Sequence, residues 1–158
     1  MMKMKSFMTM MAVAAIMMGM SSCGSDDSTE APVAVAAQVA GSYSGDEVVK
    51  VNNEDSSNET RTYVFTKATD NTIDMVVPEV GMGMMTIPSV TVKGINLSKD
   101  GNTIKGSLEK YEGTAGDKAY TVSNVTVLFN DKIVVVTFTE KYGKMPFDLV
   151  TTFTGTKK

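Results

Sequence analysis

Residues able to carry catalysis are few in this sequence of 158 residues, which contains no histidine and a single cysteine, Cys23. Histidine is the usual general base, so serine–histidine and cysteine–histidine mechanisms are excluded in their ordinary form. Carboxylate pairs remain a route to glycoside hydrolysis. However, most acidic residues fall in predicted loops or on outward faces, and only Glu47 falls on an inward face, with Tyr43 and Val49. We therefore expect a protein that is not an enzyme and that uses no cofactor.

Methionines gather in the segment Gly81-Met82-Gly83-Met84-Met85. Thioether sulfur binds Cu(I), so one interpretation is a copper site, which would need several methionines to converge without help from histidine or cysteine. A second is a pliable apolar lip at a barrel mouth, since methionine repacks around varied ligands. A third, which we favour, is a hydrophobic loop folded over one end of the domain. We expect no bound metal.

Cys23 follows a segment with the marks of a secretory signal peptide. Lys3 and Lys5 give it a basic start, and the uncharged residues 7–20 are too short to span a membrane comfortably. Small residues lead directly to Cys23, an arrangement that resembles a bacterial lipobox, in which the cysteine becomes the acylated first residue. The alternative is an ordinary secreted protein, but a lone thiol is a liability in an oxidising compartment. We predict a signal peptide over residues 1–22 and a lipid anchor on Cys23.

Charge and composition describe the rest of the chain. Removing the two leader lysines leaves 13 Lys and Arg against 18 Asp and Glu, a net charge of −5. A mildly acidic chain without a basic run argues against nucleic acid as a partner. Residues 23–39 are acidic and small at first and predict a flexible tether, with room for a short helix over 33–39. Residues 40–158 are long enough for one domain with its own core.

From residue 40 onward, the pattern is one of strands. Short runs rich in Val, Ile, Thr, Tyr and Phe alternate with turn residues, as at Asp100-Gly101 and Asn130-Asp131. A change of phase near Gly94 predicts a bulge. The run 132–140 is apolar on both faces, which predicts a well-covered strand, and residues 52–59 read as a polar loop. Eight strands are predicted, over residues 41–52, 60–67, 71–78, 89–98, 103–110, 120–129, 132–140 and 147–155.

The connections between these strands predict their arrangement. Most are short, and no convincing helix separates the strands, which favours an antiparallel meander. Eight strands can close into a barrel, and closure removes the two sheet edges that invite aggregation. The predicted fold is therefore an all-β, eight-stranded antiparallel barrel, with a two-sheet sandwich as the alternative.

Three segments carry a resemblance to a known family. The start of the first strand, Gly41-Ser42-Tyr43-Ser44-Gly45, resembles the G-x-Y-x-G opening of the calycin-like domain of Bacteroidetes lipoproteins. Residues 86–95 (TIPSVTVKGI) and the terminal Phe153-Thr154-Gly155 are similar to segments of the same domain. The resemblance implies a lipocalin-like barrel on a lipid anchor and brings no catalytic residues and no established ligand. The acidic tail at residues 24–27 also resembles a signal that exports such lipoproteins to the cell surface.

Two functions follow as expectations. The first is an outer-membrane, lipid-anchored module that sequesters a small apolar or amphipathic ligand inside the barrel. It faces the cell surface, with the periplasmic face as the alternative. The second is a surface protein with a filled barrel that contacts a protein or glycan, or inhibits a protease. For the first function, the expected ligand-binding residues line the barrel or its entrance: Tyr43, Val49, Tyr63, Phe65, Met75, Val127 and Phe138 inside, and Met82, Met84 and Met85 at the mouth.

Overall fold

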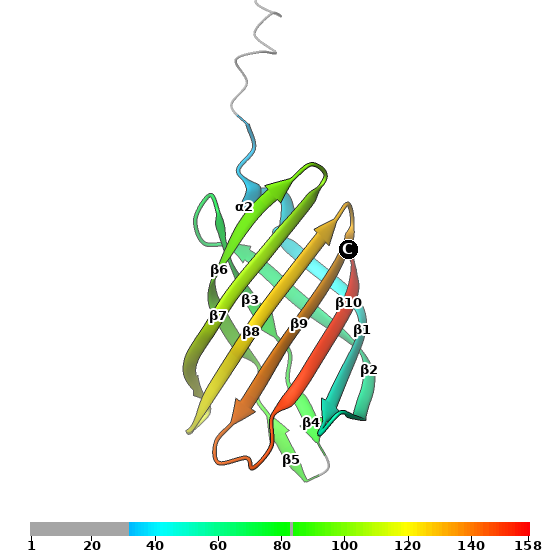
Figure 1. The fold of residues 1–158 in the computed structure, drawn as a ribbon, viewed down its shortest axis with the longest axis vertical. Coiled ribbons are helices and arrows are strands. Elements are labelled where there is room, and N and C mark those ends of the chain that lie inside the picture. Colours follow the sequence, from blue (N-terminus) through cyan, green and yellow to red (C-terminus); the bar gives the residue numbers. More distant parts are fainter. Residues whose placement is uncertain (1–31, 83) are drawn as a thin grey trace, which may run out of the picture. The chain divides into compact units, whose positions relative to one another are not determined.

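The computed structural model describes residues 32–82 and 84–158 of the chain. A short helix precedes ten strands (Figure 1). In chain order these elements are α2 (Val35–Val39), β1 (Gly41–Val51), β2 (Glu54–Lys67), β3 (Thr72–Val77), β4 (Val80–Met82), β5 (Met85–Ile87), β6 (Val90–Asp100), β7 (Thr103–Ala115), β8 (Lys118–Asn130), β9 (Ile133–Tyr142) and β10 (Leu149–Lys157).

Eight of the strands form a closed antiparallel barrel in the order β1-β10-β9-β8-β7-β6-β3-β2. Neighbours in the barrel are neighbours in sequence, apart from the closing pair β1–β10 and the pair β3–β6, which the hairpin β4–β5 interrupts. This confirms the predicted eight-stranded meander barrel and replaces the sandwich alternative. The segment that holds the methionines forms a separate two-stranded sheet, with Val80 opposite Ile87 and Met82 opposite Met85.

The turns follow from residues that tolerate a positive φ. Asn52 and Asn53 have φ values of 52° and 68° and form a tight turn, so β2 begins directly afterwards at Glu54. The predicted polar loop over 52–59 is therefore wrong. Residues 54–59 extend β2, and they lack an apolar face because this half of the strand is exposed on both sides.

The bulge predicted near Gly94 is confirmed. Ile73 pairs with Ile95 and Met75 with Val92, so one extra residue is inserted in β6. Gly94 takes a φ of +78°, and its N–H donates to Oδ1 of Asp74 at 3.0 Å. The strand thereby changes phase, and both Val92 and Ile95 point inward, where each is fully buried.

The barrel closes where two glycines meet. Gly45 of β1 lies opposite Gly155 of β10. A Cβ atom on Gly45 would lie 1.9 Å from the carbonyl oxygen of Thr154, so the close approach of the backbones requires glycine there. The two glycines of the opening and terminal segments noted in the sequence thus have a structural reason for their identity.

Aromatic side chains fill the interior of the barrel. The rings of Tyr63 and Phe153 stack with their centroids 4.1 Å apart, and Phe65 contacts Tyr43 and Phe129 edge-on at 5.4 and 5.1 Å. All five residues are at most 2% exposed. Burial of these aromatic side chains stabilises the fold, since each removes a large apolar area from water.

The two ends of the barrel differ. Helix α2 covers one end, where Tyr43 Oη donates to the carbonyl of Val39 at 3.0 Å and Ala36 is fully buried (Figure 1). This agrees with the short helix allowed by the sequence. The other end carries the hairpin β4–β5, whose Val80 and Ile87 are buried. The described chain therefore enters the barrel at the α2 end.

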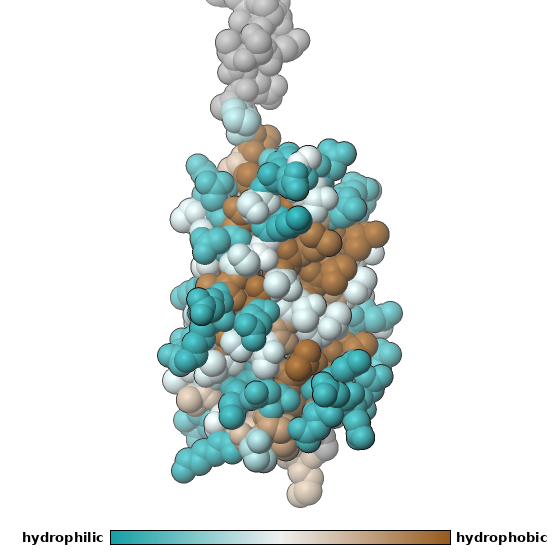
Figure 2. All heavy atoms as spheres, viewed as in Figure 1, coloured by the Kyte–Doolittle hydropathy of each residue, from teal (hydrophilic) through white to brown (hydrophobic). Residues whose placement is uncertain are grey.

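The outer face of β9 corrects a prediction. The run 132–140 was predicted to form a well-covered strand, but Ile133 of β9 is 51% exposed. Leu128 on the neighbouring β8 is also exposed, at 41%, so β9 is not covered on both faces. Figure 2 shows the result, with apolar patches interspersed among polar side chains on the face viewed. Closing the barrel makes one face of each strand interior and leaves the other face in solvent.

Candidate functional site

A pocket of about 660 Å³ opens at the end of the barrel opposite α2. Three segments build it: the hairpin β4–β5, the turn between β7 and β8, and the loop between β9 and β10. We call it the mouth pocket. Its lining residues are Met85, Asp117, Lys118, Ala119, Tyr142, Gly143, Lys144, Met145, Pro146 and Phe147.

Hydrogen bonds fix the loop that forms one wall of the mouth pocket. Gly143 adopts a φ of +59°, and its N–H donates to the carbonyl of Ala119 at 2.7 Å, which ties the loop to the start of β8. The N–H of Met145 donates to the carbonyl of Tyr142 at 3.3 Å. The Tyr142 hydroxyl donates to the carbonyl of Ala115 at 3.0 Å and so holds the aromatic ring in place. These hydrogen bonds to the backbone hold the pocket wall against β8 and the end of β7.

The lining of the mouth pocket combines an apolar floor with charged groups. Met145 is 6% exposed and Tyr142 5%, so these two side chains form the floor, with Met85 and Phe147 partly buried beside them. Lys118 and Lys144 are exposed at the rim. Such a lining suits a small molecule with an apolar body and a polar end.

A smaller pocket of about 390 Å³ lies at the α2 end. Polar groups form most of it, among them Gln38, Lys99 and Asn102, and Lys99 Nζ donates to Gln38 Oε1 at 2.9 Å. This contact ties α2 to the end of β6. The polar lining and the internal pairing make this pocket a weaker candidate for an apolar ligand than the mouth pocket.

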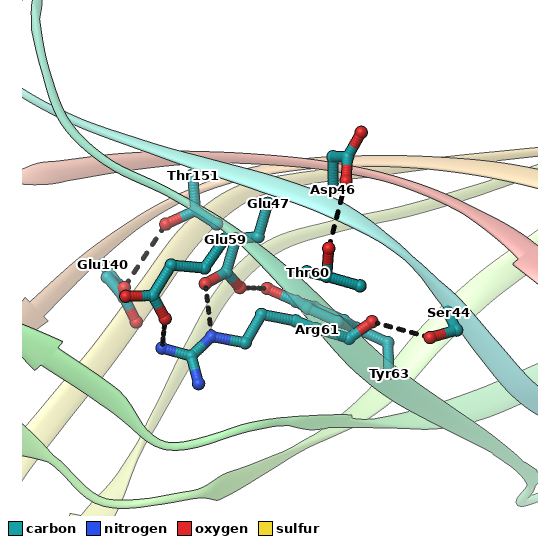
Figure 3. A network of polar contacts seen from close by, with 9 residues as sticks. All are labelled: Ser44, Asp46, Glu47, Glu59, Thr60, Arg61, Tyr63, Glu140 and Thr151. Carbon is teal, nitrogen blue, oxygen red and sulfur yellow. Dashed lines mark hydrogen bonds and ion pairs between the residues drawn. The ribbon is translucent and has the colours of Figure 1, made fainter.

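Two carboxyl groups are buried inside the barrel (Figure 3). Glu47 of β1 and Glu140 of β9 are each 1% exposed. The Tyr63 hydroxyl donates to Glu47 Oε2, and Arg61 Nε lies 3.7 Å from Glu47 Oε1. Glu140 accepts from the Tyr120 hydroxyl at 2.8 Å and from Thr151 at 3.3 Å. The inward position predicted for Glu47 is therefore correct.

Burial raises the pKa of both carboxyl groups. The pKa of Glu140 rises to about 7, chiefly because the side chain is desolvated, while hydrogen bonds from Tyr120 and Thr151 oppose the rise. Burial also raises the pKa of Glu47, and the Tyr63 hydrogen bond and the Arg61 charge act in the opposite direction. Neither residue lines the two pockets described above. These groups are therefore part of the barrel interior and lie outside the mouth pocket.

The structure places the predicted ligand-binding residues in two groups. Met85 lines the mouth pocket, and Met84 beside it is fully exposed. The seven residues expected inside the barrel are at most 2% exposed, and none of them lines either pocket described above: Tyr43, Val49, Tyr63, Phe65, Met75, Val127 and Phe138. Met82 lies in β4. Cys23 and the predicted signal peptide lie outside the described residues.

Sequence reasoning missed Glu140 and the pocket wall at residues 142–147. Glu140 had a signal, because it continues the inward series Val134, Val136 and Phe138 at alternate positions. The wall had none, since its glycine, lysine and proline read only as a turn. Within residues 32–82 and 84–158, no three His, Cys, Asp or Glu side chains form a group that could hold a metal. In the same ranges, no helix is long and apolar enough to cross a membrane.

Comparison with known proteins places this geometry in a wider context. A family model described as a calycin-like beta-barrel domain matches residues 39–156. No curated protein sequence matches the chain significantly. The crystal structure of a "putative outer membrane protein" from Bacteroides fragilis NCTC 9343 matches with a TM-score of 0.69 at 19% sequence identity. The match covers 80% of this chain and 54% of that protein, so the chain spans about half its length.

Proposed function

Since this chain belongs to the family of calycin-like β-barrel domains, we propose that it is a lipid-anchored binding module of the outer membrane that holds a small apolar or amphipathic molecule. The observation that carries the proposal is the mouth pocket, which has about 660 Å³ of space over an apolar floor. Pockets of 300–1,000 Å³ with this kind of lining are typical of sites for small molecules.

The proposed ligand site is at the mouth of the barrel, whereas the sequence predicted a site inside it. The seven interior residues expected to line a cavity are instead packed into the core, where, for example, the rings of Tyr43 and Phe65 contact edge-on. Among the residues expected at the entrance, Met85 contributes directly to the pocket. Methionine suits such a site because its flexible side chain adapts to ligands of different shape.

The predicted lipid anchor supports both the location and the orientation. Cys23 follows a basic and apolar leader, and the Bacteroides fragilis protein of similar fold is described as a putative outer membrane protein. An extended chain spans at most about 3.5 Å per residue, so the residues between Cys23 and Val33 allow a reach of about 35 Å. This tether joins the barrel at the α2 end, and the mouth pocket lies at the other end, away from the attachment point. Exposure at the cell surface, as the acidic residues after Cys23 suggest, would present the pocket to the medium.

We propose a binding module and not an enzyme. The sequence lacks histidine, and the buried carboxyl groups of Glu47 and Glu140 accept hydrogen bonds from tyrosines inside the barrel. A general acid must reach a substrate to act, and neither group lines a described pocket.

The filled interior of the barrel favours a second candidate function. A barrel whose inward aromatics contact one another has no need of a ligand to be stable, and such a module can work through its surface loops on a protein or a glycan, or as a protease inhibitor. Calycin-like barrels are only a scaffold in that case, and the exposed loops would carry the function.

Mass spectrometry of protein purified from its own host tests the proposal. We expect a co-purifying apolar or amphipathic molecule, and we expect Ala119→Trp to remove it. Ala119 is exposed inside the mouth pocket, so an indole ring there fills the space without disturbing the core. Ala37→Trp, on the exposed side of α2, is the matched control and should leave the molecule bound. Equal loss from both variants, or no bound molecule in the unaltered protein, would favour the surface-interaction candidate.

A further inference from the structure

We infer that the mouth pocket selects amphipathic anions, a carboxylate being the simplest, over neutral molecules of the same shape. This inference rests on the proposed function and adds the chemistry of the ligand's polar end. Lys118 and Lys144 would receive the anionic group at the rim, and the apolar body would lie on Met85, Met145 and Phe147.

Lys118 is held in place at the rim. Its Nζ lies 5.4 Å from the centroid of the Tyr142 ring, a distance at which a cation is attracted to the aromatic face. The Tyr142 hydroxyl is itself bonded to the carbonyl of Ala115, so the ring that supports the lysine is fixed. Among the described residues, no carboxylate lies within ion-pair distance of Lys118, which leaves its charge available to a ligand.

Lys144 also lines the mouth pocket and belongs to the loop between β9 and β10. The Cβ position of Gly143, the residue before Lys144, is 3.2 Å from Cδ of Lys118, so the two lysine-bearing segments are in contact. Lys144 is exposed and, in the part of the chain that the structure describes, forms no ion pair. Two basic groups therefore share one rim.

The charge of the mouth pocket is opposite to that of the protein. The lining carries Lys118, Lys144 and one acid, Asp117, and so has a net charge of +1. The chain as a whole carries a net charge of −3. A local positive rim beside an apolar floor attracts a molecule that has both an anionic end and an apolar body. Asp117 opposes that attraction.

Binding of decanoate and decanol to the purified full chain, below the concentration at which either aggregates, tests the inference. Methyl resonances of methionine report the place of binding, because Met85 and Met145 line the mouth pocket and Met75 lies in the core. We expect both probes to shift Met85 and Met145, and decanoate to bind more tightly. Lys144→Met and Lys118→Met should each weaken decanoate about two- to fivefold and leave decanol unchanged, as expected for exposed charges. Asp117→Asn should strengthen decanoate by a similar factor.

The controls separate the two proposals. Lys105→Met removes an exposed lysine from the outer face of β7 and should change neither affinity. Equal binding of decanoate and decanol, with no response to Lys144→Met or Asp117→Asn, would overturn the selection of anions and leave the pocket proposal standing. If neither probe shifts Met85 or Met145, both proposals fail.

Discussion

Glu47 and Glu140 are the residues that contrast most with their surroundings. Both lie among the aromatic side chains of the barrel, and a buried carboxyl group is costly unless it is hydrogen-bonded. Each has a tyrosine donor, Tyr63 for Glu47 and Tyr120 for Glu140. Arg61 lies close to Glu47, and among the described residues no cation pairs with Glu140. Burial is the main cause of the rise in the pKa of Glu140 to about 7, and the negative charge of Glu47 adds to it.

The raised pKa of Glu140 predicts that stability falls as pH rises. An unfolded glutamate has a pKa of about 4.3, so between about pH 4.5 and pH 7 the folded protein binds a proton that the unfolded chain releases. The stability due to this group is fully present below that range and is lost above it. We expect the free energy of unfolding to drop by about 1–3 kcal/mol from pH 5 to pH 8.

Glu140→Gln should reduce this dependence, leaving the smaller part that comes from the raised pKa of Glu47, and make the protein more stable than the unaltered chain at pH 8. Chemical unfolding followed by circular dichroism across this pH range measures the effect. Glu109→Gln, at an exposed position of β7, should leave the slope unchanged. An undiminished slope in Glu140→Gln would show that another group is responsible.

At the scale of elements, the ladder between β1 and β10 closes the barrel, and Gly45 determines how near the two strands approach. A methyl group at this position would lie 1.9 Å from the Thr154 carbonyl oxygen and 2.5 Å from Cα of Gly155, so the backbones would have to separate. Both contacts are to main-chain atoms, which cannot rotate away as a flexible side chain would.

Gly45→Ala is therefore expected to destabilise the protein by about 1–3 kcal/mol or more, as overpacking of a well-filled site does. Urea unfolding gives the free-energy change. The matched control is Gly81→Ala in β4, where no atom lies within 4 Å of the added methyl group, and we expect a change below about 0.5 kcal/mol. Equal effects of the two substitutions would contradict the role of the close approach.

Most elements could be predicted from sequence, because strands with one buried face alternate in their residues. β3 is a clear example, with Ile73, Met75 and Val77 all inward. The first half of β2 could not be predicted, since residues 54–60 have no apolar face and so do not show the alternation typical of a strand. β4 and β5 are too short for a pattern. The mouth pocket combines one predicted residue, Met85, with a loop whose contacts depend on the tertiary fold, such as the bond from Gly143 to Ala119.

At the scale of the whole molecule, the predicted anchor and the barrel are separate parts of the chain, joined by the predicted tether. The described chain from Val33 onward forms one compact unit, and the predicted acylation site lies ahead of it. Several acyl chains on one cysteine would give stable membrane attachment, whereas a single chain gives marginal binding.

Cys23→Ala is expected to move the protein from the membrane fraction to the soluble fraction without altering the barrel. Fractionation of cells expressing each form, followed by immunoblotting, measures the distribution, and circular dichroism confirms that the fold is retained. Ser25→Ala, which keeps the cysteine, is the control and should remain with the membrane. Continued membrane attachment of the Cys23→Ala protein after loss of its leader would refute the lipid anchor.

The pairing of the first barrel strand with the last has a consequence for how the protein matures. Tyr43 pairs with Lys157 across nearly the whole domain, while most other ladders join neighbours in sequence. Hairpins between neighbours form early, but a contact across such a separation waits until the entropy of a long loop has been overcome. During synthesis, the free edges of β1 and β9 thus remain open until β10 has emerged. The nascent chain depends on the nine residues of β10, Leu149–Lys157, to end this aggregation-prone stage.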